Sequence, residues 1–177
     1  MSYFDYESCI IDIPDYPEPG VIFKDITPLF ANAAALQHAV REIADHFRSA
    51  GITKVVGPEA RGFMIGVPVA MELSAGFIPA RKSGKLPRET FSASYELEYG
   101  TDTLEIHQDA IEPGDRVLIV DDLIATGGTA SATGKLVQDV GAELVGYACI
   151  LELVFLNPHD ALAQAGDQEL FSLVKVR

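Results

Sequence analysis

Two adjacent carboxylates, Asp121 and Asp122, lie at the centre of a stretch that could bind and orient a small ligand. They follow the four apolar residues 117–120 and precede the small-residue run 125–129. Four consecutive apolar residues are typical of a strand that is buried on both faces. Neighbouring strand residues point to opposite faces, so we expect the two acids at the end of this strand to have different roles.

The small residues after the acids predict a phosphate-binding turn. Residues 125–129 carry little bulk ahead of a predicted helix, so backbone amides and the helix dipole can receive a phosphate there. Acids beside such a turn suit a ribose 5-phosphate, whose 2- and 3-hydroxyls could donate to Asp122 and Asp121. A plain strand-to-helix turn is the alternative. The glycine spacing and the lack of a following Lys exclude the common ATP and dinucleotide motifs.

The elements that must position these residues alternate between strands and helices. Helices are predicted at residues 32–51, 61–74 and 158–165, and from the glycine turn to about residue 140. Strands are predicted at residues 53–57, 77–80, 92–98, 103–107, 117–120 and 143–153, and near the C-terminal end. This alternation predicts an α/β fold with a central parallel sheet, where ligands bind beyond the carboxyl ends of the strands.

Composition limits the possible functions. The 177 residues are 48% hydrophobic, which predicts one compact domain. A net charge of −13 argues against a nucleic-acid partner, and no apolar run is long enough to predict a membrane span. Cys9 and Cys149 have no metal-like or redox spacing, and the chain start lacks a signal-peptide pattern, so we expect a cytoplasmic location.

One segment is basic although the chain as a whole is acidic. Residues 81–88 hold four of the 13 Lys and Arg residues of the chain. A focused positive site on an acidic body would attract a small polyanion without attracting DNA. A solvated basic loop is the alternative.

The sequence of residues 121–129, Asp-Asp-Leu-Ile-Ala-Thr-Gly-Gly-Thr, resembles the phosphoribosyl-pyrophosphate (PRPP) motif of type I phosphoribosyltransferases, in the form typical of adenine-specific members. Similar stretches extend from about residue 17 to 171. The resemblance implies a single domain over residues 1–177, with a hood at about 1–30 and a flexible flap at about 83–106. It also implies a set of ribose-phosphate ligands: Asp121, Asp122, Ala125, Thr126, Gly127, Gly128 and Thr129.

Two further segments resemble the diphosphate-binding parts of this family. Residues 57–62, Gly-Pro-Glu-Ala-Arg-Gly, are similar to the pyrophosphate loop, which implies a cis peptide bond between Glu59 and Ala60. Residues 81–87 resemble the family's Arg-Lys-x-Gly-Lys-Leu-Pro segment. Without the family resemblance, Arg61 would be interpreted as an ordinary arginine at a helix start. The implied diphosphate ligands are Glu59, Ala60, Arg61, Arg81, Lys82 and Lys85.

The predicted flap resembles the family's catalytic loop at residues 97–100, Leu-Glu-Tyr-Gly. The resemblance implies that Glu98 assists proton transfer at the purine and that Tyr99 closes over the site, with Arg61 as the third catalytic residue. Taken alone, Glu98 would be an exposed acid on a strand. Relatives that use hypoxanthine or guanine carry Asp at the position of Ala125, so Glu98 is the carboxylate left for the base.

The N-terminal residues 17–28 resemble the family's base-recognition hood. The resemblance implies that the Ile22 backbone reads the adenine edge, that Phe23 lines the pocket and that Lys24 lies nearby. Many relatives carry Arg at position 24, and Lys lacks its planar fork. Phe23 would otherwise be a core aromatic residue. Leu156 aligns with a residue that packs on the base.

The resemblance as a whole implies purine salvage by a glycosyltransferase: adenine and PRPP give AMP and diphosphate. It implies Mg²⁺ held through substrate and water rather than directly by side chains, and a homodimer without nucleic-acid or membrane partners. One alternative is a phosphoribosyltransferase for another nucleobase, which the hood and Ala125 disfavour. The other is a PRPP-binding regulator or scaffold without catalysis. The flap disfavours this reading, as does the lack of an added DNA-binding segment.

Overall fold

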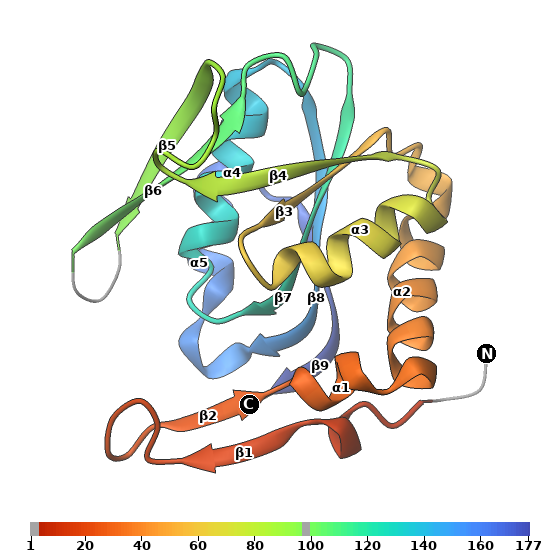
Figure 1. The fold of residues 1–177 in the computed structure, drawn as a ribbon, viewed down its shortest axis with the longest axis vertical. Coiled ribbons are helices and arrows are strands. Elements are labelled where there is room, and N and C mark those ends of the chain that lie inside the picture. Colours follow the sequence, from red (N-terminus) through yellow and green to blue (C-terminus); the bar gives the residue numbers. More distant parts are fainter. Residues whose placement is uncertain (1–3, 97–99) are drawn as a thin grey trace.

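A twisted seven-stranded sheet forms the centre of the computed structural model, which describes residues 4–96 and 100–177 (Figure 1). The strand order is β5-β6-β4-β3-β7-β8-β9, and a separate two-stranded sheet, β1-β2, lies at one end. Neighbours from β4 to β9 are parallel, whereas β6 is antiparallel to both β4 and β5. The predicted α/β fold with a mainly parallel sheet is confirmed.

The strands of the described residues are β1 (Ile11–Pro14), β2 (Ile22–Asp25), β3 (Lys54–Pro58), β4 (Gly76–Lys82), β5 (Thr90–Glu96), β6 (Thr101–His107), β7 (Arg116–Ile124), β8 (Glu143–Leu153) and β9 (Glu169–Val176). The α-helices are α1 (Thr27–Ala31), α2 (Ala33–Phe47), α3 (Gly62–Glu72), α4 (Gly128–Asp139) and α5 (Pro158–Leu162). Short 3₁₀ turns are η1 (Glu7–Cys9), η2 (Arg48–Ala50), η3 (Val154–Leu156) and η4 (Ala163–Ala165).

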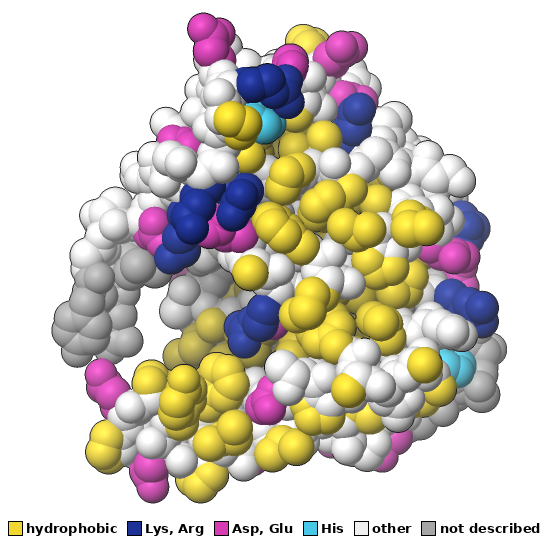
Figure 2. Space-filling model, viewed as in Figure 1, with side chains coloured by type: hydrophobic (Ala, Val, Ile, Leu, Met, Phe, Trp, Pro, Cys, Tyr) yellow, Lys and Arg dark blue, Asp and Glu magenta, His cyan; other side chains and the backbone are white. Residues whose placement is uncertain are grey.

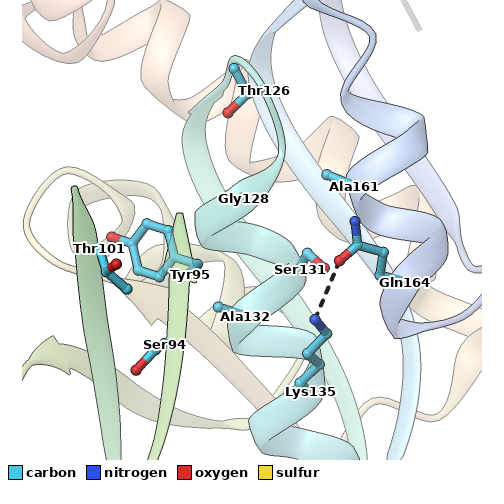
Figure 3. Close-up of a pocket in the computed structure, with 10 residues that line it drawn as sticks. All are labelled: Ser94, Tyr95, Thr101, Thr126, Gly128, Ser131, Ala132, Lys135, Ala161 and Gln164. Atoms are coloured by element: carbon cyan, nitrogen blue, oxygen red, sulfur yellow. Dashed lines mark hydrogen bonds between the residues drawn. The ribbon is translucent and has the colours of Figure 1, made fainter. Parts of the chain in front are cut away.

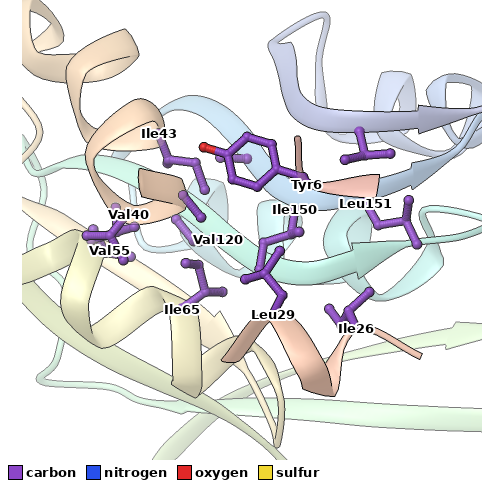
Figure 4. Packing of buried hydrophobic residues seen from close by; sticks show 14 of the residues in the cluster. Tyr6, Ile26, Leu29, Val40, Ile43, Val55, Ile65, Val120, Ile150 and Leu151 are labelled. Carbon is purple, nitrogen blue, oxygen red and sulfur yellow. The ribbon is translucent and has the colours of Figure 1, made fainter. Parts of the chain in front are cut away.

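Helices cover both faces of the sheet, with α2 and α3 on one side and α4 and α5 on the other (Figure 1). β7 packs against the helices on both faces of the sheet because its side chains alternate. Leu118 and Val120 face α2 and α3, whereas Val117 and Ile119 face α4. All four residues are fully buried. Figure 4 shows the first of these layers, in which Val120 packs among residues of α2, α3 and the N-terminal segment.

Local sequence signals predicted several elements well. The side chain of Asn32 caps α2, accepting hydrogen bonds from the backbone N–H groups of Ala34 and Ala35. The strand predicted at residues 143–153 is present as β8. The flap strands pair in antiparallel register from Thr90 opposite His107 to Glu96 opposite Thr101.

The structure also corrects the predicted elements. β4 continues to Lys82, two residues beyond the predicted end, because its last residues pair with β6. The strands of the hood, β1 and β2, were not predicted: the family resemblance indicated only that a hood lies there. They are four residues each and lie on either side of a turn with a cis Tyr16–Pro17 bond.

No helix in the described part of the chain is long and apolar enough to cross a membrane.

Burial of α2 generates a prediction for stability. Ile43 of α2 is fully buried, so Ile43→Ala should lower the free energy of unfolding by about 2–5 kcal/mol through lost contacts and a residual cavity. Urea unfolding measures the change. The matched control is Ile11→Ala, because Ile11 is 52% exposed and should change stability by no more than about 0.5 kcal/mol. Equal effects of the two substitutions would contradict the assignment of the core.

Candidate active site

The acid pair lies inside β7 rather than after it. The sequence predicted a strand at residues 117–120 with the acids at its end, but β7 continues to Ile124. The reason is β8, which runs alongside and pairs Leu151 with Leu123 and Glu152 with Ile124. The predicted strand end was therefore wrong. Pairing within the sheet fixes the backbone on both sides of the acids.

Both carboxylates lie beside the start of α3. Asp122 is 3% exposed, and its Oδ2 lies 2.8 Å from Nε of Arg61. This contact is an ion pair that lacks hydrogen-bond geometry. Oδ1 of Asp121 accepts a 2.8 Å hydrogen bond from the backbone N–H of Asp122. The same oxygen would lie 2.9 Å from a Cβ added to Gly62, so only glycine allows α3 to start this close.

Side-chain alternation breaks at the acids. Leu118 and Val120 pack toward α2 and α3, and so does Leu123, which strict alternation would place on the other face. Ile150 and Leu151 show the same break in the neighbouring strand β8. The break thus lies between Val120 and Leu123, and the opposite orientation of Asp121 and Asp122 stays a prediction.

The buried position changes the acidity of the pair. Burial raises the pKa of Asp121 well above its usual range, and the neighbouring charge of Asp122 raises it further. Burial also raises the pKa of Asp122, while the Arg61 guanidinium acts in the opposite direction. The site therefore favours hydrogen-bond donors, such as ligand hydroxyls, that stabilise charge on these oxygens.

The turn from β7 into α4 encloses a small cavity. Its volume is about 110 Å³, and its lining includes all five predicted residues of this turn: Ala125, Thr126, Gly127, Gly128 and Thr129. Gly127 has a φ of 82°, a left-handed conformation that glycine adopts readily. It provides no side-chain cap for α4, and uncapped amides at a helix start bind anions.

A larger cavity extends from this turn along α4 (Figure 3). It has a volume of about 630 Å³ and lies among α4, the flap strands and the α5 region. Tyr95 of β5 lies on one side, and on the other Nζ of Lys135 donates to Oε1 of Gln164 at 3.4 Å. Thr126 and Gly128 line both cavities, so the phosphate turn borders an open groove that leads to the flap.

The turn from β3 into α3 connects the acid pair to the end of β4. The peptide bond between Glu59 and Ala60 is cis, which confirms what the family resemblance implied. Oε2 of Glu59 accepts a 2.7 Å hydrogen bond from Nε of Arg81, the penultimate residue of β4. Arg61, at the other end of the turn, reaches Asp122. The predicted diphosphate residues of the two segments are thus adjacent.

Carboxylates neutralise much of the basic segment at residues 81–88. Three of its cations form ion pairs with acids: Arg81 with Glu59, Lys82 with Asp102, and Arg88 with Asp109. A hydrogen bond to Asp102 raises the pKa of Lys82. Lys85 follows in the exposed turn after β4. The positive charge is therefore less concentrated than the sequence predicted, because acids distant in sequence fold against it.

β2 of the hood places its predicted residues on alternating sides. Ile22, Phe23 and Lys24 are consecutive in this strand, and Ile22 is 58% exposed. Nζ of Lys24 lies 2.7 and 2.6 Å from the two carboxylate oxygens of Asp12 in β1. Lys24 also lines a cavity of about 430 Å³ with residues 174–176. Its charge is thus directed at the hairpin and the end of β9.

Asp25 lies near the site but was not among the predicted site residues. It ends β2 and accepts a 2.9 Å hydrogen bond from the Thr27 backbone N–H, which lowers its pKa, and the charge of Arg61 acts in the same direction. Because the Arg61 charge acts on its carboxylate, Asp25 lies close to the same helix start as Asp122. Strand alternation was the available signal, because Asp25 follows Phe23 by two residues on the same face.

The remaining predicted residues are Leu156, Glu98 and Tyr99. Leu156 is 40% exposed in the turn η3, next to Phe155, which is 61% exposed. The two side chains give the carboxyl end of β8 an apolar surface. Glu98 and Tyr99, the other predicted catalytic residues, lie outside the described residues; only the strands that lead to them are described.

Comparisons with known proteins agree with this arrangement. Residues 25–174 match the family model of the phosphoribosyl transferase domain. Adenine phosphoribosyltransferase of Yersinia pestis (strain Pestoides F) is 56% identical over 154 residues, which cover 87% of this chain and 82% of that protein.

Solved structures show the same fold along nearly the whole chain. Adenine phosphoribosyltransferase from Thermoanaerobacter pseudethanolicus is 45% identical with a TM-score of 0.91, covering 97% of this chain and 98% of that chain. The Saccharomyces cerevisiae enzyme, solved with adenine and an imino-altritol bisphosphate, is 40% identical with a TM-score of 0.89, covering 96% of each chain. The chain therefore belongs to the phosphoribosyltransferase family, among its adenine phosphoribosyltransferases.

Proposed function

We propose that this protein transfers the phosphoribosyl group of PRPP to adenine, giving AMP and diphosphate. The observation that carries the proposal is the acid pair Asp121–Asp122 next to the cavity of the phosphate turn, two features that match the hydroxyls and the 5-phosphate of one ligand. The Yersinia pestis relative and the adenine in the yeast structure support adenine as the acceptor. Residues 1–177 act as one catalytic domain, with a hood at about 1–30 and a flap at about 83–106.

The ribose phosphate binds between the acid pair and the phosphate turn. Asp121 and Asp122 accept hydrogen bonds from the ribose hydroxyls, and the amides of residues 125–129 hold the 5-phosphate. Arg61 lies 2.8 Å from Asp122, so a hydroxyl that donates a hydrogen bond to this carboxylate competes with the guanidinium. Once displaced, Arg61 can turn to the diphosphate.

The diphosphate binds where the β3–α3 turn meets the end of β4. Arg61, Arg81, Lys82 and Lys85 offer positive charge there, and the turn at Glu59 and Ala60 offers backbone groups. Arg81 and Lys82 must exchange their carboxylate partners for phosphate oxygens. The planar fork of arginine suits this exchange because it binds two phosphate oxygens in parallel.

Adenine binds between the hood and the turn after β8. Phe23 and Leu156 pack on the ring, the Ile22 backbone reads its edge, and Lys24 supports the hood through Asp12. Glu98 on the flap assists proton transfer at the base, and Tyr99 closes over the site. Ala125 cannot take this role because it has no ionisable group.

The protein acts mainly by positioning and charge stabilisation. The C1–O bond to diphosphate weakens first, and N9 of adenine attacks the oxocarbenium-like ribose from the opposite face. No side chain acts as a nucleophile. Arg61 and the cations of residues 81–85 stabilise the departing diphosphate, and the flap excludes water from the reactive ribose.

Magnesium fits this site as a substrate-bound ion. Among residues 4–96 and 100–177, no three His, Cys, Asp or Glu side chains lie close enough together to hold a metal. Mg²⁺ prefers oxygen ligands and keeps several waters. PRPP oxygens and water would therefore supply most of its coordination, with Asp121 and Asp122 close by, and the ion would offset negative charge on the diphosphate.

A nucleobase panel tests the proposed reaction. Adenine, hypoxanthine, guanine, xanthine and orotate are each incubated with PRPP, Mg²⁺ and the protein, and diphosphate release is measured. Adenine alone should give rapid release together with AMP. Faster release with another base would identify that base as the acceptor, and no release with any base would favour a PRPP-binding regulator.

The cysteines support a cytoplasmic location for this activity. Cys9 and Cys149 are both buried and form no disulfide. Burial raises the pKa of Cys149 to about 12, which leaves it an unreactive thiol at neutral pH. We include a reducing cytoplasm in the proposal for this reason.

The ribose-binding role of Asp122 generates a second prediction. Asp122→Asn removes the charged acceptor, so PRPP affinity should fall by about 1.5–3 kcal/mol, or roughly 10- to 150-fold. Titration calorimetry with PRPP and Mg²⁺ measures the affinity, and a thermal melt confirms folding. Asp139→Asn, at the exposed end of α4, is the control and should bind like wild type. Unchanged PRPP affinity in Asp122→Asn would refute the ribose-hydroxyl assignment.

The proton-transfer role of Glu98 generates a third prediction. Glu98→Gln should lower kcat by about 10²- to 10⁴-fold, the usual contribution of a general acid or base, with a much smaller change in KM. Steady-state rates between pH 6 and 9 measure the effect. Glu89→Gln, at an exposed position before β5, is the matched control. A Glu98→Gln rate equal to that of wild type at every pH would exclude this role.

We also propose that the protein is a homodimer. Met64, Val67 and Met71 on α3 are 43%, 40% and 75% exposed, and their spacing places them on one side of the helix. Figure 2 shows hydrophobic side chains gathered on this face of the molecule. An exposed apolar patch of this kind is typical of an interface, and an α3 contact would place two active sites near one another.

The dimer proposal generates a fourth prediction. Val67→Glu puts a charge into the apolar patch, so the mass measured by light scattering during gel filtration should fall from dimer to monomer. Val21→Glu, at a hood position that is 44% exposed, is the control and should remain dimeric. A wild-type protein that is monomeric at micromolar concentration would contradict the proposal.

A further inference from the structure

A buried carboxylate near the end of β8, shortly before the turn that carries Leu156, has no predicted role. Glu152, the penultimate residue of β8, is 0% exposed, and both of its oxygens have partners. Oε2 accepts a 2.6 Å hydrogen bond from the Ser172 hydroxyl, and Nζ of Lys175 lies 3.4 Å from the same oxygen. Oε1 lies 3.0 Å from Nε2 of His159. Burying a charge without such partners is strongly unfavourable, so the contacts around Glu152 fix its position.

The partners of Glu152 come from two different elements. Ser172 and Lys175 belong to β9, whereas His159 belongs to the first turn of α5. The chain between Glu152 and His159 contains the 3₁₀ turn η3 and therefore Leu156. The contact between Glu152 and His159 joins the chain before this turn to the chain after it, so it holds the two ends of the turn together.

The same helix, α5, packs against the phosphate turn. A Cβ added to Gly127 would lie 2.7 Å from the carbonyl oxygen of Pro158 and 3.3 Å from Cβ of Ala161. Figure 3 shows Ala161 beside the turn that carries Thr126 and Gly128. Nothing larger than a hydrogen atom separates α5 from Gly127, so a shift of α5 must displace the phosphate turn.

We propose that Glu152 is a positioning residue, which acts through His159 to hold η3 and α5 in place and so aligns the base site with the phosphate turn. The proposal rests on the function proposed above. Glu152 touches neither substrate in this account. Its effect reaches adenine through Leu156, and it reaches the 5-phosphate through the contact between Pro158 and Gly127.

The charged groups around Glu152 support a stable carboxylate at this position. Burial alone would raise its pKa, but the Ser172 hydrogen bond and the charges of Lys175 and His159 outweigh burial and lower it. The Glu152 charge also acts on Cys149, and burial keeps the thiol of Cys149 protonated. Glu152 therefore remains an acceptor for His159 across the neutral range.

The test removes His159, because this side chain is 56% exposed and its loss should not unfold the protein. His159→Ala deletes the donor, whereas His159→Gln places an amide N–H near the position of Nε2. KM for adenine and for PRPP should each rise about tenfold in His159→Ala with little change in kcat, and His159→Gln should restore most of the loss. His46→Ala is the matched control, because Nε2 of His46 lies 3.0 Å from the carboxylate of Glu169, the first residue of β9, whereas Ser172 and Lys175 lie farther along that strand.

A second readout separates this proposal from the proposed reaction. The amide resonances of Gly127 and Gly128 should shift in His159→Ala but not in His46→Ala, whether or not the wild type forms AMP. A wild type without activity but with these shifts would reject the reaction and retain the positioning role. An active wild type whose His159→Ala variant matches His46→Ala in both KM values, or is not rescued by Gln, would overturn the positioning role.

Discussion

The ion pair between Arg61 and Asp122 is the contact on which the rest of the site depends. It joins the acids of β7 to the turn before α3, and that turn is joined to β4 by the pair of Glu59 and Arg81. The carboxyl ends of three neighbouring strands are thus linked by charged side chains that satisfy one another. The close start of α3 at Gly62 makes this geometry possible, because a side chain there would collide with Asp121.

Ligand binding in this account is an exchange of partners. In the proposed function, ribose hydroxyls would replace the Arg61 guanidinium on Asp122, and phosphate oxygens would replace the carboxylates that now pair with Arg81 and Lys82. Asp122 and Arg81 therefore each have a partner before and after the exchange, which matters because an unpaired buried charge is costly. The exchange also explains how a chain with a net charge of −13 can bind a polyanion: its cations are held locally and released at the site. A nucleic-acid backbone would meet the acidic body instead.

The sequence predicted what local signals control and missed what distant contacts control. Asn32 marks the start of α2 because its side chain caps that helix directly. The end of β7 was wrong because β8, which extends it past the acids, lies elsewhere in the sequence. The pairing of the basic segment with acids, Lys82 with Asp102 for example, depends on β6 folding beside β4 and has no local pattern. The cis bond at Glu59 and the hood came only from the family resemblance. Asp25 was accessible from strand alternation, but only once β2 was known.

The most direct test of this account is a crystal structure of the protein with AMP. The 5-phosphate should lie in the cavity of residues 125–129, the ribose hydroxyls should lie within hydrogen-bond reach of Asp121 and Asp122, and Arg61 should be turned away from Asp122. A phosphate outside this turn, or a ribose distant from the acid pair with Arg61 still bound to Asp122, would contradict it.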